Sequence, residues 1–224
     1  MMPIMGQPML ALMIERIRRA AQIDEIVIAT TADPSCDAIV ELAQQLGVHS
    51  YRGSEEDVLD RVLRAAQSVD ADLIVETTGD CPLIDPKTIN KVIETFNNDE
   101  IDYCANFLEL TYPSGMEVQV FPVRVLAEAA ESTTDLADRE HVSLYIYRHP
   151  KKYRLLNVTS NLPPQAAGYR LTVDTIEDFS LVKEIYERLY PLKPDFGITD
   201  ILELLERQPH LAEINKEVYD KAVR

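Results

Sequence analysis

The stretch DLIVETTGDCPLIDP, residues 72–86, decides the fold class. Residues 72–78 form an apolar, β-branched run that is typical of a buried strand. Residues 79–85 form a loop, and Pro86 suits the first turn of a helix that is expected to reach residue 97. The preceding chain follows the same order, with a helix beginning near Pro8, a strand over 25–30, a helix over 37–46, a strand over 48–52 and a helix over 54–68. This alternation predicts an α/β fold with a parallel sheet and right-handed crossover helices.

The second half of the chain is less regular. We expect strands over 101–105 and 117–121, a helix over 135–148, neighbouring strands over 153–158 and 169–173, and helices over 176–189, 198–207 and 211–223. No repeat, linker or low-complexity tract divides the chain, so residues 1–224 are interpreted as a single domain. The last two helices either cover the sheet or form the surface of a homodimer.

The N-terminal segment raises a topological question. A βαβ unit needs a strand before its first helix, but MMPIMGQP, residues 1–8, contains Gly6 and two prolines and is expected to be a loop. Either another chain supplies that strand, or the sheet tolerates its absence, or the sequence begins part-way through the natural protein. The third explanation is favoured, so the domain is expected to lack its first strand.

Composition excludes several classes of protein. The 224 residues carry a net charge of −16, which argues against sequence-independent binding to nucleic acid, because that binding relies on Lys and Arg. Three cysteines without a CxxC pair argue against a disulfide framework or a paired-cysteine zinc site. The sequence has no signal peptide and no apolar run of about 18 residues, so neither secretion nor a membrane span is expected. A cytoplasmic protein is the expectation.

Two aspartates stand at the expected carboxyl ends of strands, where open α/β sheets bind ligands. Asp80 follows the 72–78 strand, and Asp174 follows the 169–173 strand. If these strands are neighbours, the two carboxylates converge and offer the hard oxygen ligands that Mg²⁺ prefers together with phosphate. The alternatives are that Asp174 caps the following helix and that Asp80 stabilises a turn.

Three other segments have both a functional and a structural interpretation. Gly53-Ser54, before a helix, offers free N–H groups to an anion or simply caps the helix. Because acidic residues follow, this loop is better suited to a base or ribose, with Arg52 or Arg61 compensating charge. His141 is either a general acid–base or, more often for such a residue, a histidine satisfied by its surroundings. Cys81 is preferred as a small apolar filler.

Four motifs resemble one family over nearly the whole chain. RGSEEDVLDR (residues 52–61), TGDCPLIDP (78–86), REHVSLYI (139–146) and RLTVDTIEDF (170–179) are similar to the spore-coat polysaccharide protein F group of cytidylyltransferases. That group is similar to the CMP-sugar synthetases for 3-deoxy-manno-octulosonate and sialic-type acids. The resemblance implies a three-layer, Rossmann-like nucleotide-diphospho-sugar transferase fold, with a mixed, mostly parallel sheet flanked by helices.

The resemblance also implies a reaction and its site. A sugar hydroxyl attacks the α-phosphate of CTP and pyrophosphate leaves, for the biosynthesis of cell-surface polysaccharide from what we expect to be an acidic keto-sugar. Asp80 and Asp174 would hold Mg²⁺. The nucleotide would contact Arg52, Gly53, Ser54, Asp57, Arg61 and Gly79, and the sugar would face Glu117, Gln119, Arg139, Glu140 and His141.

Two departures from the family pattern bear on activity. The chain lacks the Arg- and Gly-containing loop of the form ARxxSxRLPGK that precedes the first helix in this group, and Gln119 stands where relatives more often show a carboxylate. An amide cannot act as a base or carry charge to a metal. The alternative functions are therefore a catalytically impaired member that serves as a binding or assembly module, or a nucleotidyltransferase that uses another nucleotide.

Overall fold

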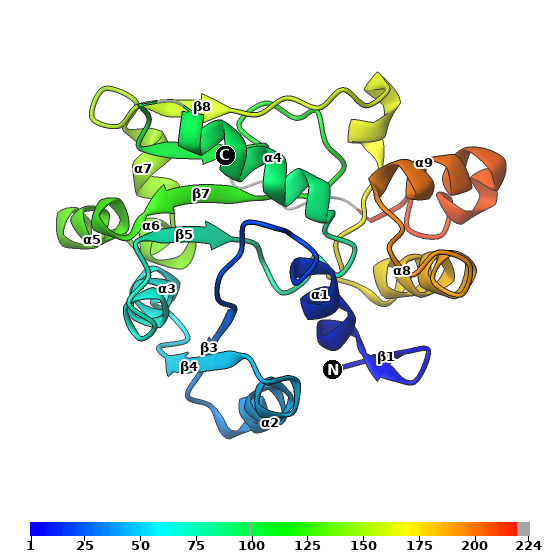
Figure 1. The fold of residues 1–224 in the computed structure, drawn as a ribbon, viewed down its shortest axis with the longest axis horizontal. Coiled ribbons are helices and arrows are strands. Elements are labelled where there is room, and N and C mark those ends of the chain that lie inside the picture. The colour runs from blue at the N-terminus through cyan, green and yellow to red at the C-terminus, as the bar shows by residue number, and fades with distance from the viewer. Residues whose placement is uncertain (99, 219–224) are drawn as a thin grey trace.

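A computed structural model describes residues 1–98 and 100–218 of the chain (Figure 1). The elements, in chain order, are β1 Pro3–Ile4, β2 Gln7–Pro8, α1 Met9–Ile17, β3 Val27–Thr31, η1 Pro34–Cys36, α2 Asp37–Leu46, β4 His49–Gly53, α3 Val58–Gln67, β5 Leu73–Glu76, α4 Pro86–Asn98, β6 Tyr103–Ala105, β7 Gln119–Pro122, α5 Val123–Ser132, α6 Leu136–Glu140, α7 Leu144–Arg148, β8 Leu155–Asn157, η2 Pro164–Gly168, α8 Ile176–Leu189, α9 Ile198–Arg207 and η3 Pro209–Leu211.

The main sheet has four strands in the order β5-β7-β6-β8. Strand β7 runs antiparallel to β5 and β6, with Glu76 opposite Gln119, whereas β6 and β8 are parallel. Strands β3 and β4 form a separate parallel pair. The α/β fold with a mixed sheet flanked by helices is as expected, and the sheet is mixed because β7 enters between β5 and β6 in the reverse direction.

Side chains alternate between the two faces of this sheet, and helices cover both faces. On β7, Phe121 packs into a cluster with α3, α5 and α7, while Val120 packs into another cluster with α1 and α4. Tyr103 and Cys104 on β6 divide in the same way. The period-two pattern of buried strands therefore builds the three layers.

A third apolar cluster joins α8 and α9 to the start of the chain. It contains Ile4, Leu12 and Leu83 together with the inward faces of both helices. Figure 1 shows α8 and α9 side by side at the end of the sheet away from α5. The loop after β5, which contains Leu83, thus packs against elements from both ends of the chain.

The N-terminal segment is a small hairpin and not the expected loop. Strands β1 and β2 pair through a turn in which Met5 and Gly6 have φ of 50° and 78°. Among the described residues, β3 pairs only with β4 and β5 pairs only with β7. That the domain lacks a first strand before the first helix therefore stays a prediction.

Several expected elements differ in the structure. The helix over 135–148 is broken into α6 and α7, because Val142 adopts a left-handed conformation with φ of 43°. Residues 153–158 and 169–173 do not pair: β8 joins β6, and Arg170 makes only one isolated bridge, to Ser114. Helix α5 was not predicted. Within the helix predicted over 211–223, residues up to 217 form turns after η3, and residues 219–224 lie outside the described residues.

None of the helices within residues 1–98 and 100–218 has the length and apolar character needed to span a membrane.

Candidate active site

The loop after β5 meets the segment before α8. The main-chain oxygen of Asp80 accepts hydrogen bonds from the Val173 amide at 2.8 Å and from the Thr172 hydroxyl at 3.2 Å. Asp174 is the next residue along the chain. The structure therefore brings together the two loops that carry the predicted aspartates, although residues 169–173 do not form the expected strand.

The carboxylate of Asp80 shares its surroundings with Glu117. The Cys81 thiol lies 3.6 Å from Oδ1 of Asp80 and 3.9 Å from Oε2 of Glu117. The Gly115 amide donates to the same Glu117 oxygen at 2.6 Å. Burial raises the pKa of Glu117, and the negative charge of Asp80 raises it further. Glu117, predicted to face the sugar, thus lies close to the first predicted metal ligand.

Cys81 has the filler role that the sequence favoured. It is 2 % exposed and packs in the apolar cluster that contains residues of α1 and α4. Burial raises the pKa of its thiol well above the ordinary value, and the charges of Asp80 and Glu117 add to this effect. The thiol is therefore protonated at neutral pH and is a poor nucleophile.

Gln119 belongs to a buried polar network. Its amide nitrogen donates to Glu76 across the β5–β7 pair. Its amide oxygen accepts from the Tyr103 hydroxyl at 2.6 Å and from Ser143. Burial raises the pKa of Glu76, and the nearby Asp80 adds to the rise. These bonds account for Gln119 structurally, and its expected contact with a sugar stays a prediction.

Asp174 is exposed and pairs with a partly buried arginine. Its side chain is 58 % exposed and forms an ion pair with Arg170, which also binds the fully buried Asp178 at 3.0 Å. Thr175, not Asp174, caps α8, in a capping box with Asp178. The structural alternative from the sequence, that Asp174 is the helix cap, is therefore wrong. Its carboxylate lies at the surface beside the Asp80 loop.

The segment over 52–57 binds mainly to its own neighbours. Arg52 donates to the Thr31 and Asp33 carbonyls at 3.1 and 2.7 Å and forms an ion pair with Asp37 at 2.6 Å. A Cβ on Gly53 would come within 2.8 Å of Cγ of Arg61, so glycine allows that side chain to cross the strand end. These contacts fix the shape of the loop.

The cap of α3 differs from the one expected. Asp57 is the N-cap and accepts from the Asp60 amide at 3.0 Å, while Ser54 accepts from the Asp57 amide at 3.1 Å. Arg61 in turn donates to the Ser54 carbonyl. Contact of these residues, or of Gly79, with a nucleotide stays a prediction.

Arg139, Glu140 and His141 lie at the end of α6. Arg139 donates to Asp57 through Nε at 3.0 Å and to the Ala130 carbonyl at 3.0 Å, so it ties α6 to the cap of α3. Glu140 is exposed and His141 is partly buried at the helix end. Asp57, which was predicted to contact the nucleotide, is thus bonded to Arg139, which was predicted to face the sugar.

The magnesium site predicted from the sequence has at most two protein carboxylates, Asp80 and Asp174. Within residues 1–98 and 100–218, no group of three or more His, Cys, Asp or Glu side chains is arranged to hold a metal ion. Mg²⁺ is commonly held by one or two carboxylates with phosphate and water, and not by a cage of protein ligands. Asp80 and the exposed Asp174 lie on touching loops, and their joint binding of Mg²⁺ stays a prediction.

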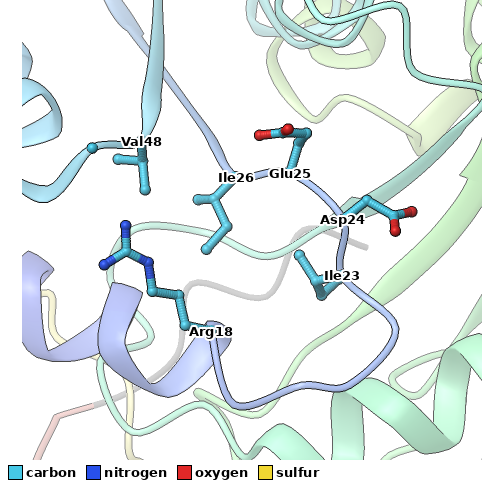
Figure 2. Close-up of a pocket in the computed structure, with 7 residues that line it drawn as sticks. Arg18, Ile23, Asp24, Glu25, Ile26 and Val48 are labelled. Atoms are coloured by element: carbon cyan, nitrogen blue, oxygen red, sulfur yellow. The ribbon is translucent and has the colours of Figure 1, made fainter.

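Two cavities lie away from these aspartates. The first, of about 170 Å³, lies between the end of α1 and the starts of β3 and β4. Figure 2 shows the Arg18 guanidinium near Val48, while the Asp24 carboxylate points away from it. The second, of about 340 Å³, lies between the start of α4 and α9. Neither of these two cavities is lined by Asp80 or Asp174.

Comparison with known proteins identifies relatives over nearly the whole chain. The model of a cytidylyltransferase family matches residues 1–216. The chain is 31 % identical to the spore coat polysaccharide biosynthesis protein SpsF of Bacillus subtilis, over 94 % of this chain and 88 % of that protein. It is 24 % identical to a 3-deoxy-manno-octulosonate cytidylyltransferase of Acidobacterium capsulatum, over 81 % and 87 % of the two chains.

A solved structure has the same fold. The structure of a cytidylyltransferase from Leptospira borgpetersenii superposes with a TM-score of 0.90 at 28 % identity, covering 98 % of this chain and 91 % of that one. The similarity therefore extends through both the sheet and the α8–α9 region.

Proposed function

The chain belongs to the cytidylyltransferase family, and from that premise we propose that it transfers CMP from CTP to a hydroxyl group of a sugar and releases pyrophosphate. We propose an acidic keto-sugar as the acceptor and the biosynthesis of cell-surface polysaccharide as the setting. The names of its relatives support both points, because one is a spore coat polysaccharide protein and another acts on 3-deoxy-manno-octulosonate.

The contact between the two aspartate loops carries this proposal. Hydrogen bonds from Thr172 and Val173 hold the Asp80 backbone beside Asp174. Two carboxylates on touching loops are suited to a nucleoside triphosphate accompanied by Mg²⁺. The ion would neutralise charge on the phosphate oxygens and on the departing pyrophosphate. Asp80 and Asp174 are the residues that would hold it.

The reaction itself is a displacement at phosphorus. The sugar oxygen forms a bond to the α-phosphorus, the bond from that phosphorus to the bridging oxygen breaks, pyrophosphate carries away the electron pair of that bond, and the hydroxyl proton passes to solvent water. The chain supplies position and charge. We propose that Glu117, beside Asp80, contacts the sugar, and that the 52–61 segment contacts the nucleoside. The contact of Gln119 with the sugar is part of the same proposal, and in the chain its amide donates to the carboxylate of Glu76.

Turnover with a matched pair of variants tests the proposal. Pyrophosphate release is measured with CTP, Mg²⁺ and a panel of acidic keto-sugars, and CTP binding is measured by calorimetry with and without Mg²⁺. Asp80→Asn should lower turnover about 100-fold or more and abolish the effect of Mg²⁺ on CTP binding. Asp72→Asn, an exposed change at the other end of β5, should leave both unchanged.

Two results would contradict the proposal. Tighter binding of UTP or GTP than of CTP would point to another nucleotide. The absence of Mg²⁺-dependent nucleotide binding in the unaltered chain would favour the alternative that the sequence left open, a binding or assembly module.

A further inference from the structure

Three carbonyl groups of the Asp80 loop are held from three different parts of the fold. The Asp80 carbonyl accepts from Thr172 and Val173, as described above. The Pro82 carbonyl accepts from the Tyr186 hydroxyl of α8 at 2.7 Å. The Ile84 carbonyl accepts from Nε of Arg16, on α1, at 2.8 Å. The loop that carries the predicted metal ligand is therefore fixed by long-range hydrogen bonds at alternate residues.

The Tyr186 hydroxyl is placed for this one contact. The residue is fully buried, and its ring packs edge-on against Phe196 with the centroids 5.4 Å apart. Burial raises the pKa of Tyr186, so the hydroxyl stays protonated and can donate a hydrogen bond. Since Pro82 is itself buried, the hydroxyl satisfies a carbonyl that is shielded from water.

Helix α8 joins this contact to the second aspartate. The helix begins at Ile176, two residues after Asp174, and its first turn is closed by the capping box of Thr175 and Asp178. Asp178 also accepts from the Asp174 amide at 3.1 Å. The same rigid helix therefore fixes the backbone of Asp174 at its start and the Asp80 loop further along, through Tyr186.

We propose that Tyr186 is a positioning residue that sets the Asp80 loop relative to Asp174 through α8. The proposal rests on the proposed function, in which these two aspartates bind Mg²⁺ with the nucleotide. Tyr186 touches neither ion nor substrate. Its hydroxyl determines the spacing of the two carboxylates, and a change in that spacing weakens the cooperation between Mg²⁺ and CTP.

Tyr186→Phe tests this role, and Tyr190→Phe is its matched control. Tyr186 lies in α8 and Tyr190 caps its C-terminus, so both changes remove one tyrosine hydroxyl from the same region, but the Tyr190 hydroxyl donates to Glu15, at 3.0 Å, and not to the Asp80 loop. Hydrogen exchange of residues 78–85 is measured without ligand. Calorimetry measures how CTP binding strengthens as Mg²⁺ is added, and gives the half-saturating Mg²⁺ concentration, at which half of this effect is reached.

We expect Tyr186→Phe to raise exchange in residues 78–85 and to raise the half-saturating Mg²⁺ concentration about tenfold, as loss of an outer-shell partner does at metal sites. Tyr190→Phe should do neither. Thr172→Val, which removes a hydroxyl that donates to the Asp80 carbonyl, should reproduce the Tyr186→Phe result and serves as the second variant if Tyr186→Phe does not fold.

The outcomes separate this role from the proposed function. Unchanged exchange and unchanged Mg²⁺ dependence in Tyr186→Phe, with the unaltered chain binding CTP and Mg²⁺ together, would overturn the positioning role alone. Equal effects of Tyr186→Phe and Tyr190→Phe would overturn it as well, since they would reflect general loss of stability. An unaltered chain without Mg²⁺-dependent CTP binding would overturn both proposals.

Discussion

Gln119 faces Glu76 across the antiparallel β5–β7 pair and donates its amide to the Glu76 carboxylate. The position that the family resemblance would give to a carboxylate is thus an amide, and the carboxylate stands opposite it. A second acid at residue 119 would place two negative charges in contact in a buried place. The amide can instead bond to Glu76, Tyr103 and Ser143 at once.

The Glu76 carboxylate should make stability depend on pH. Burial raises its pKa above the ordinary 4.5, so the folded chain holds this proton at pH values where the unfolded chain has released it. The free energy of unfolding therefore falls as pH rises from about 4.5 through the folded pKa, and then levels off. Glu76→Gln should remove this decline and be more stable than the unaltered chain at pH 8.

Urea unfolding between pH 4.5 and pH 8 measures this effect, and Glu109→Gln, an exposed glutamate, is the control. The control should follow the unaltered chain at every pH. If Glu76→Gln were less stable than the unaltered chain at pH 8, the charged carboxylate would be stabilising and the inferred pKa direction would be wrong.

The two aspartates that share Arg170 should differ greatly in their contribution to stability. Asp178 is fully buried, and Asp174 is 58 % exposed. Asp178→Asn leaves a largely buried guanidinium without its main partner, for which a loss of about 3–5 kcal/mol is expected. Asp174→Asn breaks a surface pair and should cost no more than about 1 kcal/mol.

Acid sensitivity provides a second measurement on the same pair. Burial alone would raise the pKa of Asp178, but the hydrogen bonds from Arg170 and Asn215 hold it below the ordinary 3.8. Its contribution is therefore complete above about pH 4 and is lost as pH falls through the lower, folded value. Similar losses for Asp178→Asn and Asp174→Asn in urea unfolding would contradict the structural difference between them.

Gly115 should tolerate no side chain. Its φ is +94°, and a Cβ would lie 2.5 Å from the Leu171 carbonyl carbon and 2.6 Å from the Thr172 nitrogen. Gly115→Ala combines backbone strain with a clash against main-chain atoms, so it should lose about 2–3 kcal/mol or more. Gly168→Ala, where nothing lies within 4 Å, should change stability by less than about 1 kcal/mol in the same denaturation experiment.

Local patterns predicted most single elements of the fold. The helices over 37–46 and 176–189 have the bounds expected from their apolar spacing, and Gly47 ends α2 with φ of 63°. Strand pairing was harder, because the direction of β7 depends on contacts with distant segments. Helix α5 was not predicted, because it starts directly after Pro122, the last residue of β7, with no turn signal between the two elements.

The candidate site likewise has residues that local sequence patterns could predict and others that they could not. Asp80 and Asp174 could be singled out because each follows an apolar run, and their loops do touch. The partners that fix them carry no local signal: the Tyr186 hydroxyl bonds to a carbonyl 104 residues away in the chain. Asp57 and Arg139 were both assigned to ligands, whereas their mutual pairing depends on how α6 packs against the start of α3.

The three cysteines should react with thiol reagents at very different rates. Hydrogen bonds from Thr30 and Thr31 lower the pKa of the partly exposed Cys36, whereas burial raises that of Cys81. Because the thiolate is the reactive form, iodoacetamide at pH 7.5 should label Cys36 in the folded chain. Cys81 and the buried Cys104 should be labelled only after unfolding. Mass spectrometry of the labelled peptides locates the sites, and Cys36→Ser should show no labelling while folded. Labelling of Cys81 at a rate near that of Cys36 would mean that the Asp80 loop opens readily, which its four long-range hydrogen bonds argue against.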